Sequence, residues 1–194
     1  VARTQVVHHP RCIFAPAGSR AAKLRDPMPT DPHVYVDADA CPVKPEAAKV
    51  AERHGLAVTF VANVWLQLPR APRVRMQVVT GAFDAADDWI VEQVVVADVV
   101  VTADIPLASR CLKKGARVLG PAGKPFTEDN IGNALATREL MSDLRAYGVG
   151  GGPPPFGPRD RSRFLEALEH AVREAKRQRA GGVASPVTPP AMAP

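Results

Sequence analysis

The chain has 194 residues, 46% of them hydrophobic and 23% charged, with a formal charge of +5 at pH 7. These values are ordinary for one globular domain and exclude collagen-like and wholly disordered chains. There is no apolar run of about 18 residues, so no membrane span is predicted. The three widely spaced cysteines include no C-x-x-C pair, which argues against a disulfide scaffold and predicts a reducing compartment, here the cytoplasm.

The first 32 residues carry most of the positive charge and show no sustained periodicity. Residues 1–25 contain five bases and no acid, whereas residues 26–157 contain more acids than bases. Five prolines interrupt any helix in this stretch. We expect a disordered basic arm over 1–32. The alternative interpretations are a transit peptide and a true start at Met28, with the preceding residues as upstream sequence. The body is mildly acidic, so net charge by itself does not predict a nucleic-acid partner.

From His33 onward, apolar strands alternate with helical patterns. Buried strands are predicted at 33–37, 56–62, 74–80, 98–102 and 116–119. Helices are predicted at 44–54, 84–95 and 105–114, with a glycine ending the first and the third. Because the strands are apolar on both faces and alternate with helices, the pattern predicts an α/β protein with a central, mostly parallel sheet of about five strands.

Two longer helices are predicted after the last strand. Thr127 is placed to cap a helix reaching about Tyr147, whose inward residues would be Ile131, Leu135, Met141 and Leu144. The domain is therefore expected over 33–147. Residues 148–179 should form a Gly/Pro-rich loop and a C-terminal helix packed on that domain, and 180–194 a low-complexity disordered tail. The apolar stripe of that last helix is Phe164, Leu165, Leu168, Val172 and Ala175.

Acidic residues follow the predicted strands. Asp37 and Asp39 come at the end of the first strand, Asp104 comes after the fourth, and Asp84 and Asp87 open the helix between the third and fourth. Parallel strands bring their carboxyl ends to one edge of the sheet, where ligands of open α/β proteins bind. We therefore expect these five carboxylates to converge. The alternative is helix capping, because Asp39, Asp84 and Asp104 each stand just before a helix.

Converging carboxylates repel one another and raise each other's pKa unless a cation lies among them. Mg²⁺ and Mn²⁺ prefer oxygen ligands, and such ions activate water for attack on phosphodiesters. The pattern therefore predicts a Mg²⁺ or Mn²⁺ site for phosphoryl chemistry. Lys44, Arg73 and Trp65 are expected beside it, where cations and an aromatic ring suit single-stranded nucleic acid. The alternative for Trp65 is packing on the core.

Five motifs occur in order between about His33 and Ala171. They are V-D-A-D-A-C-P-V-K, V-A-N, G-A-F-D-A-A-D, V-T-A-D-I-P-L-A and G-G-P-P-P-F-G-P-R-D-R. Together they resemble the YaiI/YqxD family of bacterial proteins, which looks like a branch of the PIN-like nuclease superfamily. The resemblance implies a PIN-like three-layer fold with a C-terminal helix added, and acids at the strand ends that hold Mg²⁺ or Mn²⁺.

The resemblance also implies roles for individual residues. Asp37 matches the first-strand acid, Asp87 the helical acid and Asp104 the acid after the fourth strand, and these three would be catalytic and would bind the metal. Neither Glu46 nor Glu52 matches the further acid of an early helix, so Asp39 and Asp84 are taken as additional metal ligands. The predicted substrate-binding residues are Lys44, Asn63, Arg73 and Thr102.

Three functional hypotheses follow. The first is a metal-dependent nuclease, in the first place a ribonuclease acting on single-stranded RNA by metal-activated water. The second is a non-catalytic RNA- or protein-binding module on the same scaffold, because fold does not fix function. The third is a haloacid-dehalogenase-like phosphatase, whose D-x-D motif the Asp37–Asp39 pair resembles. The last helix is also a candidate homodimer contact.

Overall fold

The computed structural model describes residues 31–39, 41–69, 71–81, 84–146 and 156–182. Residues 1–30 of the arm predicted over 1–32, residues 148–155 of the predicted loop and residues 183–194 of the tail predicted over 180–194 lie outside the described residues. Among the helices within these ranges, none combines the length and hydropathy needed to cross a bilayer.

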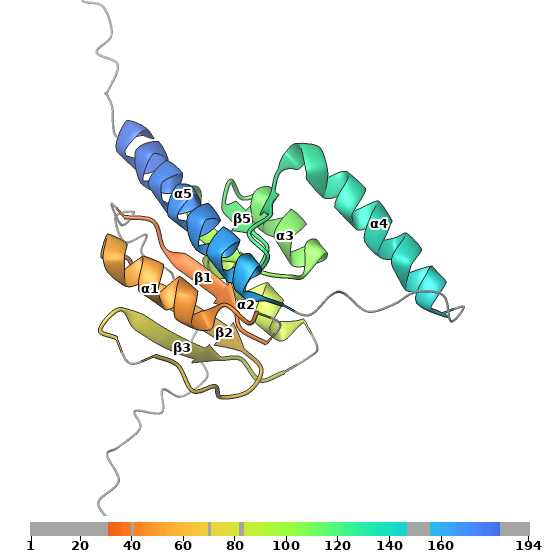
Figure 1. The fold of residues 1–194 in the computed structure, drawn as a ribbon, viewed down its shortest axis with the longest axis horizontal. Coiled ribbons are helices and arrows are strands. Elements are labelled where there is room, and N and C mark those ends of the chain that lie inside the picture. Colours follow the sequence, from red (N-terminus) through yellow and green to blue (C-terminus); the bar gives the residue numbers. More distant parts are fainter. Residues whose placement is uncertain (1–30, 40, 70, 82–83, 147–155, 183–194) are drawn as a thin grey trace, which may run out of the picture.

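A mixed sheet forms the centre of the fold (Figure 1). Its strands are β1 (Val34–Asp37), β2 (Val58–Ala62), β3 (Val74–Val78), β4 (Val99–Val101), β5 (Arg117–Leu119) and β6 (Pro125–Phe126). They lie in the order β3-β2-β1-β4-β5-β6, and every pair is parallel except β5 with β6. The predicted parallel sheet is confirmed. The sequence pattern missed β6, because a two-residue edge strand that begins with proline carries no periodicity.

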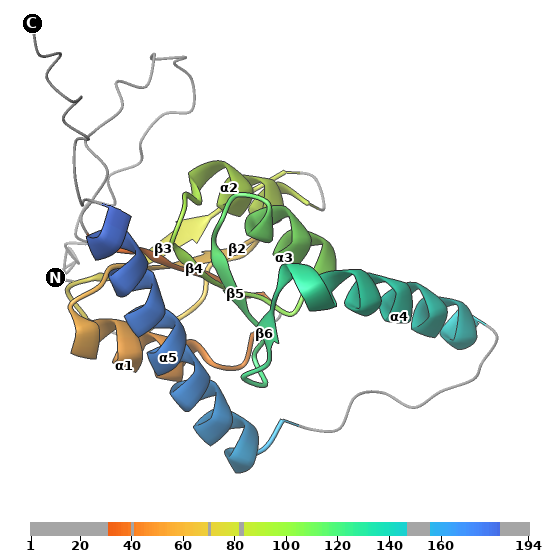
Figure 2. The same ribbon diagram turned by 90° about the horizontal axis from the view of Figure 1, so that it is seen from above.

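Helices cover both faces of the sheet, which makes three layers (Figure 2). The helices are α1 (Lys44–His54), α2 (Ala85–Gln93), α3 (Ile105–Leu112), α4 (Glu128–Ala146) and α5 (Pro158–Gly182). One core cluster joins the sheet to α1 and α5, and the other joins it to α2 and α3. The predicted helices are confirmed, with ends that shift by a few residues.

The central strands are apolar on both faces because each face has its own core. On β4, Val99 and Val101 belong to the cluster with α1 and α5, whereas Val100 belongs to the cluster with α2 and α3. All three valines are fully buried. Alternating side chains thus fix the register, since a slip of one residue would exchange the two cores.

The C-terminal helix α5 is part of the domain. Four residues of its predicted stripe, Phe164, Leu168, Val172 and Ala175, are fully buried against the sheet and α1. The helix runs on to Gly182, three residues beyond its predicted end at 179. Its last turns are held by an ion pair between Arg179 and Asp98, which the stripe pattern could not indicate.

Helix α4 corrects one sequence expectation. Ile131 packs on the core near α3, but Met141 is 50% exposed and the neighbouring Leu140 is 58% exposed. Met141 is therefore not an inward residue as predicted. The reason is tertiary: only the first part of α4 lies against α3, and the rest of the helix extends away from the body (Figure 2).

Candidate functional site

The five predicted acids all belong to segments at the carboxyl edge of the parallel strands. Asp37 is the last residue of β1 and Asp39 follows it. Asp104 is the N-cap of α3 just after β4, Asp84 holds the N-cap position of α2, and Asp87 lies in the first turn of α2. Three separate segments therefore deliver carboxylates to one edge, as the strand pattern predicts. We call Asp37, Asp39, Asp84, Asp87 and Asp104 the acidic edge.

A buried hydroxyl connects two of these acids. Thr102, which is fully buried, donates from Oγ1 to Oδ2 of Asp37 at 2.8 Å. The same Oγ1 accepts the backbone N–H of Asp104 at 2.9 Å. Asp37 itself is only 6% exposed. One neutral side chain thus orients Asp37 and the start of the Asp104 turn together.

Burial and neighbouring carboxylates raise the pKa of Asp37. Burial is the largest cause, and the charges of Asp39 and Asp104 act in the same direction. The hydrogen bond from Thr102 acts in the opposite direction, because it stabilises the carboxylate form, but it does not outweigh burial. The carboxylate of Asp37 therefore sits in a field that disfavours its negative charge.

Asp87, in the first turn of α2, is affected by the same negative charges. Its pKa is raised to about 6, first by burial and then by the charges of Asp37, Asp104 and Asp84, with Arg110 opposing them. These causes link acids from β1, the β4–α3 turn and α2. The acidic edge is therefore one electrostatic unit, which is the arrangement that a divalent cation would relieve.

The donor atoms suit a hard cation, but they are not gathered into a closed cage. Within the ranges that the structure describes, no three His, Cys, Asp or Glu side chains lie close enough together to hold one ion. Mg²⁺ commonly keeps several waters and takes only one or two carboxylates together with substrate phosphates. An open carboxylate edge fits that mode of binding better than it fits an all-protein site.

Helix capping accounts for only part of the acidic edge. Oδ1 of Asp104 accepts the backbone N–H of Leu107 at 2.9 Å, so this aspartate does cap α3. Asp84 makes no capping hydrogen bond with its side chain. Oδ2 of Asp39 accepts the backbone N–H of Asn63 at 2.8 Å, which ties the end of β1 to the end of β2 rather than to a helix.

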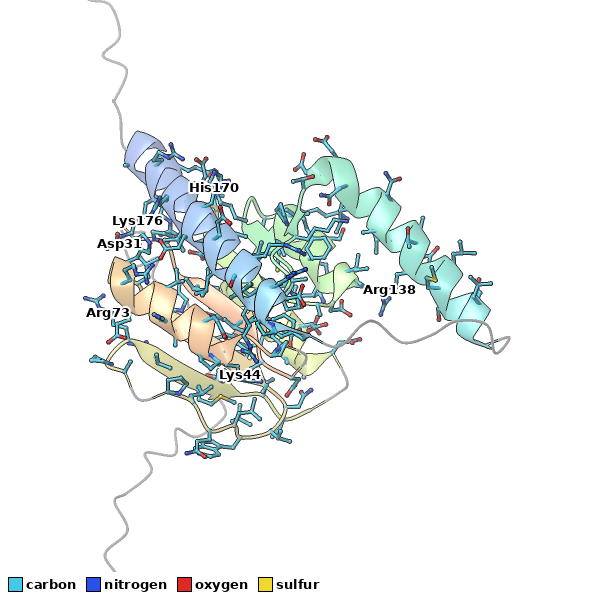
Figure 3. All side chains as sticks on the ribbon, viewed as in Figure 1. Asp31, Lys44, Arg73, Arg138, His170 and Lys176 are labelled. Atoms are coloured by element: carbon cyan, nitrogen blue, oxygen red, sulfur yellow. The ribbon has the colours of Figure 1, made fainter. Side chains whose placement is uncertain are left out.

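The predicted substrate-binding residues divide into two groups. Lys44 opens α1 at the carboxyl edge, where its Nζ donates to the carbonyl of Cys41 at 3.1 Å. Thr102 and Asn63 are also at this edge, although Thr102 is buried and Asn63 contributes its backbone N–H. Arg73 is not brought there. It precedes β3 at the amino ends of the parallel strands, so it lies at the opposite edge of the sheet from Lys44 (Figure 3).

The sequence does not determine the positions of two further side chains, Trp65 and Arg138. Trp65 is 72% exposed, so it does not pack on the core. Arg138 of α4 places Nη2 3.6 Å from Oδ2 of Asp104, which brings a cation to the acidic edge from a distant part of the chain. No local pattern indicates this contact, because it depends on how α4 lies beside α3.

Fold and site define an α/β protein with a mostly parallel sheet whose carboxyl edge carries a group of electrostatically coupled carboxylates. The sequence profile described as "Uncharacterized BCR, YaiI/YqxD family" matches residues 35–174. The chain belongs to this family, as the motifs indicate. All five acids of the acidic edge lie within the matched region.

Relatives cover most of the chain and nearly their own full length. A UPF0178 protein of Rhodopseudomonas palustris (strain BisB5) is 56% identical over 158 residues, which is 81% of this chain and 95% of the relative. The UPF0178 protein of Rhodospirillum rubrum is 58% identical over 148 residues, 75% of this chain and 99% of the relative. That of Agrobacterium fabrum is 56% identical over 151 residues, 77% and 99% of the two chains. No solved structure matches the chain.

Proposed function

We propose that the chain is a cytoplasmic, divalent-metal-dependent nuclease that hydrolyses phosphodiesters of RNA at the acidic edge. One observation carries the proposal: acids from three separate segments come together at the carboxyl edge of a parallel sheet, where burial and neighbouring negative charges raise the pKa of Asp37 and Asp87. Such a field costs stability in the free protein, and a cation that binds phosphate relieves it. The resemblance to PIN-like nucleases supports the same reaction class.

Each residue has a defined part in this proposal. Asp37 and Asp104, joined through Thr102, are the principal ligands of Mg²⁺ or Mn²⁺, with Asp39 and Asp84 beside them. When bound, the ion supplies an activated water and neutralises charge on the phosphate. Asp87, with its pKa near 6, holds or releases a proton at close to neutral pH. The Nζ of Lys44 is available for a phosphate oxygen.

The test combines cation binding with cleavage. Millimolar Mn²⁺ is expected to raise the thermal midpoint of the purified chain and to permit cleavage of single-stranded RNA. Asp37→Asn and Asp104→Asn should lose both effects. Asp88→Asn is the matched control, because Asp88 is exposed on the outer side of α2 and pairs with Arg110. Cleavage that survives Asp37→Asn and Asp104→Asn would contradict the proposal.

A non-catalytic RNA-binding module is the second candidate. The observation in its favour is that no closed three-ligand metal set exists in the described residues, while Trp65 is exposed for stacking. RNA binding with neither Mn²⁺ stabilisation nor cleavage would favour this candidate. A phosphoryl group trapped on Asp37 would instead identify a phosphatase of the haloacid-dehalogenase type.

A further inference from the structure

A groove of about 540 Å³ adjoins the acidic edge between α3, β6 and α4. The residues that matter for its chemistry are Ile105, Lys124, Phe126, Asn133 and Arg138, and we call this set the α4 groove. It combines two cationic side chains and an amide with apolar surface from an aromatic ring and an isoleucine. None of the sequence motifs assigned it a role.

The α4 groove is continuous with the acidic edge. Ile105, which lines the groove, is the residue directly after Asp104. Arg138, which is labelled on α4 in Figure 3, also lines the groove. Its Nη2 lies 3.6 Å from Oδ2 of Asp104. A molecule that reaches Asp104 from this side therefore passes Arg138, which is half exposed and able to turn toward it.

The backbone of Lys124 is fixed by a tight turn, whereas its side chain has no such contact among the described residues. The turn before β6 is closed by the N–H of Gly120, which donates to the Lys124 carbonyl at 2.9 Å. Gly123 has a φ of +77°, and a Cβ there would lie 2.8 Å from the Arg163 backbone of α5, so the turn is clamped against that helix. In the described parts of the chain, the Lys124 ammonium makes no hydrogen bond or ion pair.

The chemistry of the groove fits one nucleotide of a polyanion. A phosphodiester is repelled by the acidic edge, so a bound strand needs cations close beside that edge. Lys124 and Arg138 supply them, and Phe126 and Ile105 supply apolar surface against which an unpaired base packs. Asn133, whose side chain makes no hydrogen bond to the described residues, is available to the base or sugar.

We propose that the α4 groove binds a nucleotide of single-stranded RNA adjacent to the scissile phosphodiester, so that the substrate runs from the acidic edge along α4. This inference rests on the proposed function, since it places the substrate of that same site. It also gives a structural reason for the expected preference for single strands, because a base paired in a duplex cannot turn into the groove beside Phe126.

The test measures binding and cleavage separately. Binding of fluorescent oligouridine to the full chain is followed by anisotropy in EDTA, which prevents metal-dependent cleavage. Lys124→Ala and Arg138→Ala should each weaken binding on the order of fivefold and lower the slope of log affinity against log salt by about 0.7. Arg73→Ala is the matched control, because Arg73 is exposed at the opposite edge of the sheet (Figure 3). A duplex of the same length should bind more weakly than the single strand.

The outcomes distinguish this inference from the proposed function. Lys124→Ala is the decisive variant, because Arg138 also contacts Asp104. If the chain cleaves RNA with Mn²⁺ but Lys124→Ala binds as tightly as wild type, the nuclease stands and the groove inference fails. If Lys124→Ala weakens binding and no cleavage occurs, the groove stands and the nuclease fails. Equal losses of RNA affinity in Lys124→Ala and Arg73→Ala would overturn the inference and indicate non-specific electrostatic attraction. A Lys124→Ala variant that changes its sedimenting mass but keeps its RNA affinity would also overturn it and would indicate a homodimer contact.

Discussion

At the scale of single residues, the site depends on a neutral group that orients charged ones. Thr102 donates to Asp37 and accepts from the backbone of Asp104, so one neutral hydroxyl orients both acids. Among the described residues, Asp37 has no ion-pair partner. Burial and the neighbouring charges of Asp39 and Asp104 therefore disfavour its negative charge, and this unfavourable electrostatic energy is the physical basis of the cation binding that we propose.

The same field predicts that Asp87→Asn stabilises the protein when no divalent cation is present. The folded-state pKa of Asp87 is about 6 and its ordinary value is 3.8, so folding favours the protonated form. Between these values the folded state retains a proton that the unfolded state releases, and stability falls as the pH rises through this window. At pH about 7.5, Asp87→Asn should raise the free energy of unfolding by about 1 kcal/mol, allowing for solvent screening.

Thermal unfolding in EDTA measures this gain, which should disappear near pH about 3, below both pKa values, where Asp87 is largely protonated in both states. The control is Asp88→Asn on the next residue, which is exposed and loses an ion pair with Arg110. It should not gain stability. An equal gain in both variants would show that removing any negative charge from α2 stabilises the protein, and that the stabilisation does not depend on the other acids of the acidic edge.

At the scale of elements, α5 is fastened to the sheet at its C-terminal end by a buried ion pair. Asp98, which is 1% exposed, accepts the backbone N–H groups of His33 and Val95 as well as the guanidinium of Arg179. Arg179→Ala should lower the free energy of unfolding by about 3 kcal/mol, because it leaves a buried carboxylate without its cation. Urea unfolding checks this, with Arg177→Ala on the exposed side expected to stay within about 0.5 kcal/mol of wild type. A similarly small effect of Arg179→Ala would mean that apolar packing alone holds α5.

The elements most accessible to sequence reasoning are those with local signals. Helix α1 begins at Lys44 and ends at His54 as predicted, because Gly55 adopts the left-handed conformation at φ 67° that closes a helix. The converging acids follow from the parallel sheet, since strand ends of one direction share an edge. The same geometry shows why the predicted position of Arg73 beside the acids is wrong. Arg73 precedes the parallel strand β3, and residues before parallel strands lie at the amino ends of the strands, opposite the acidic edge.

Other parts of the site depend on tertiary placement and leave no local trace. Arg138 reaches Asp104 only because α4 begins beside α3, and the sequence of α4 has no pattern that fixes this direction. Helical spacing places Met141 on the apolar face of α4, but spacing does not determine whether another element covers that face, and Met141 is half exposed. The position of Lys124 likewise depends on a turn clamped against α5.

At the scale of the whole molecule, stability is distributed unevenly. Three layers share two core clusters, and α5 belongs to one of them through four fully buried side chains. Helix α4 leaves this body after its first turns (Figure 2), and its residues from Thr137 to Asp143 are exposed. A helix that buries little apolar surface opens at a much lower free energy than the core does. The molecule therefore combines a cooperative body with one marginal helix next to the acidic edge.

Hydrogen exchange tests this division. Backbone amides of residues 139–146 in α4 should exchange far faster than those of residues 164–175 in α5, whose exchange should require global unfolding. The comparison is sharp because both are long helices, so their difference isolates tertiary packing from helix length. Equal protection that persists on dilution would show that the body of the same molecule stabilises α4. Protection of α4 that is lost on dilution would show that a second copy covers it. Saturating oligouridine should slow exchange in residues 133–138 of α4, because Asn133 and Arg138 line the groove, and should leave exchange in α5 unchanged.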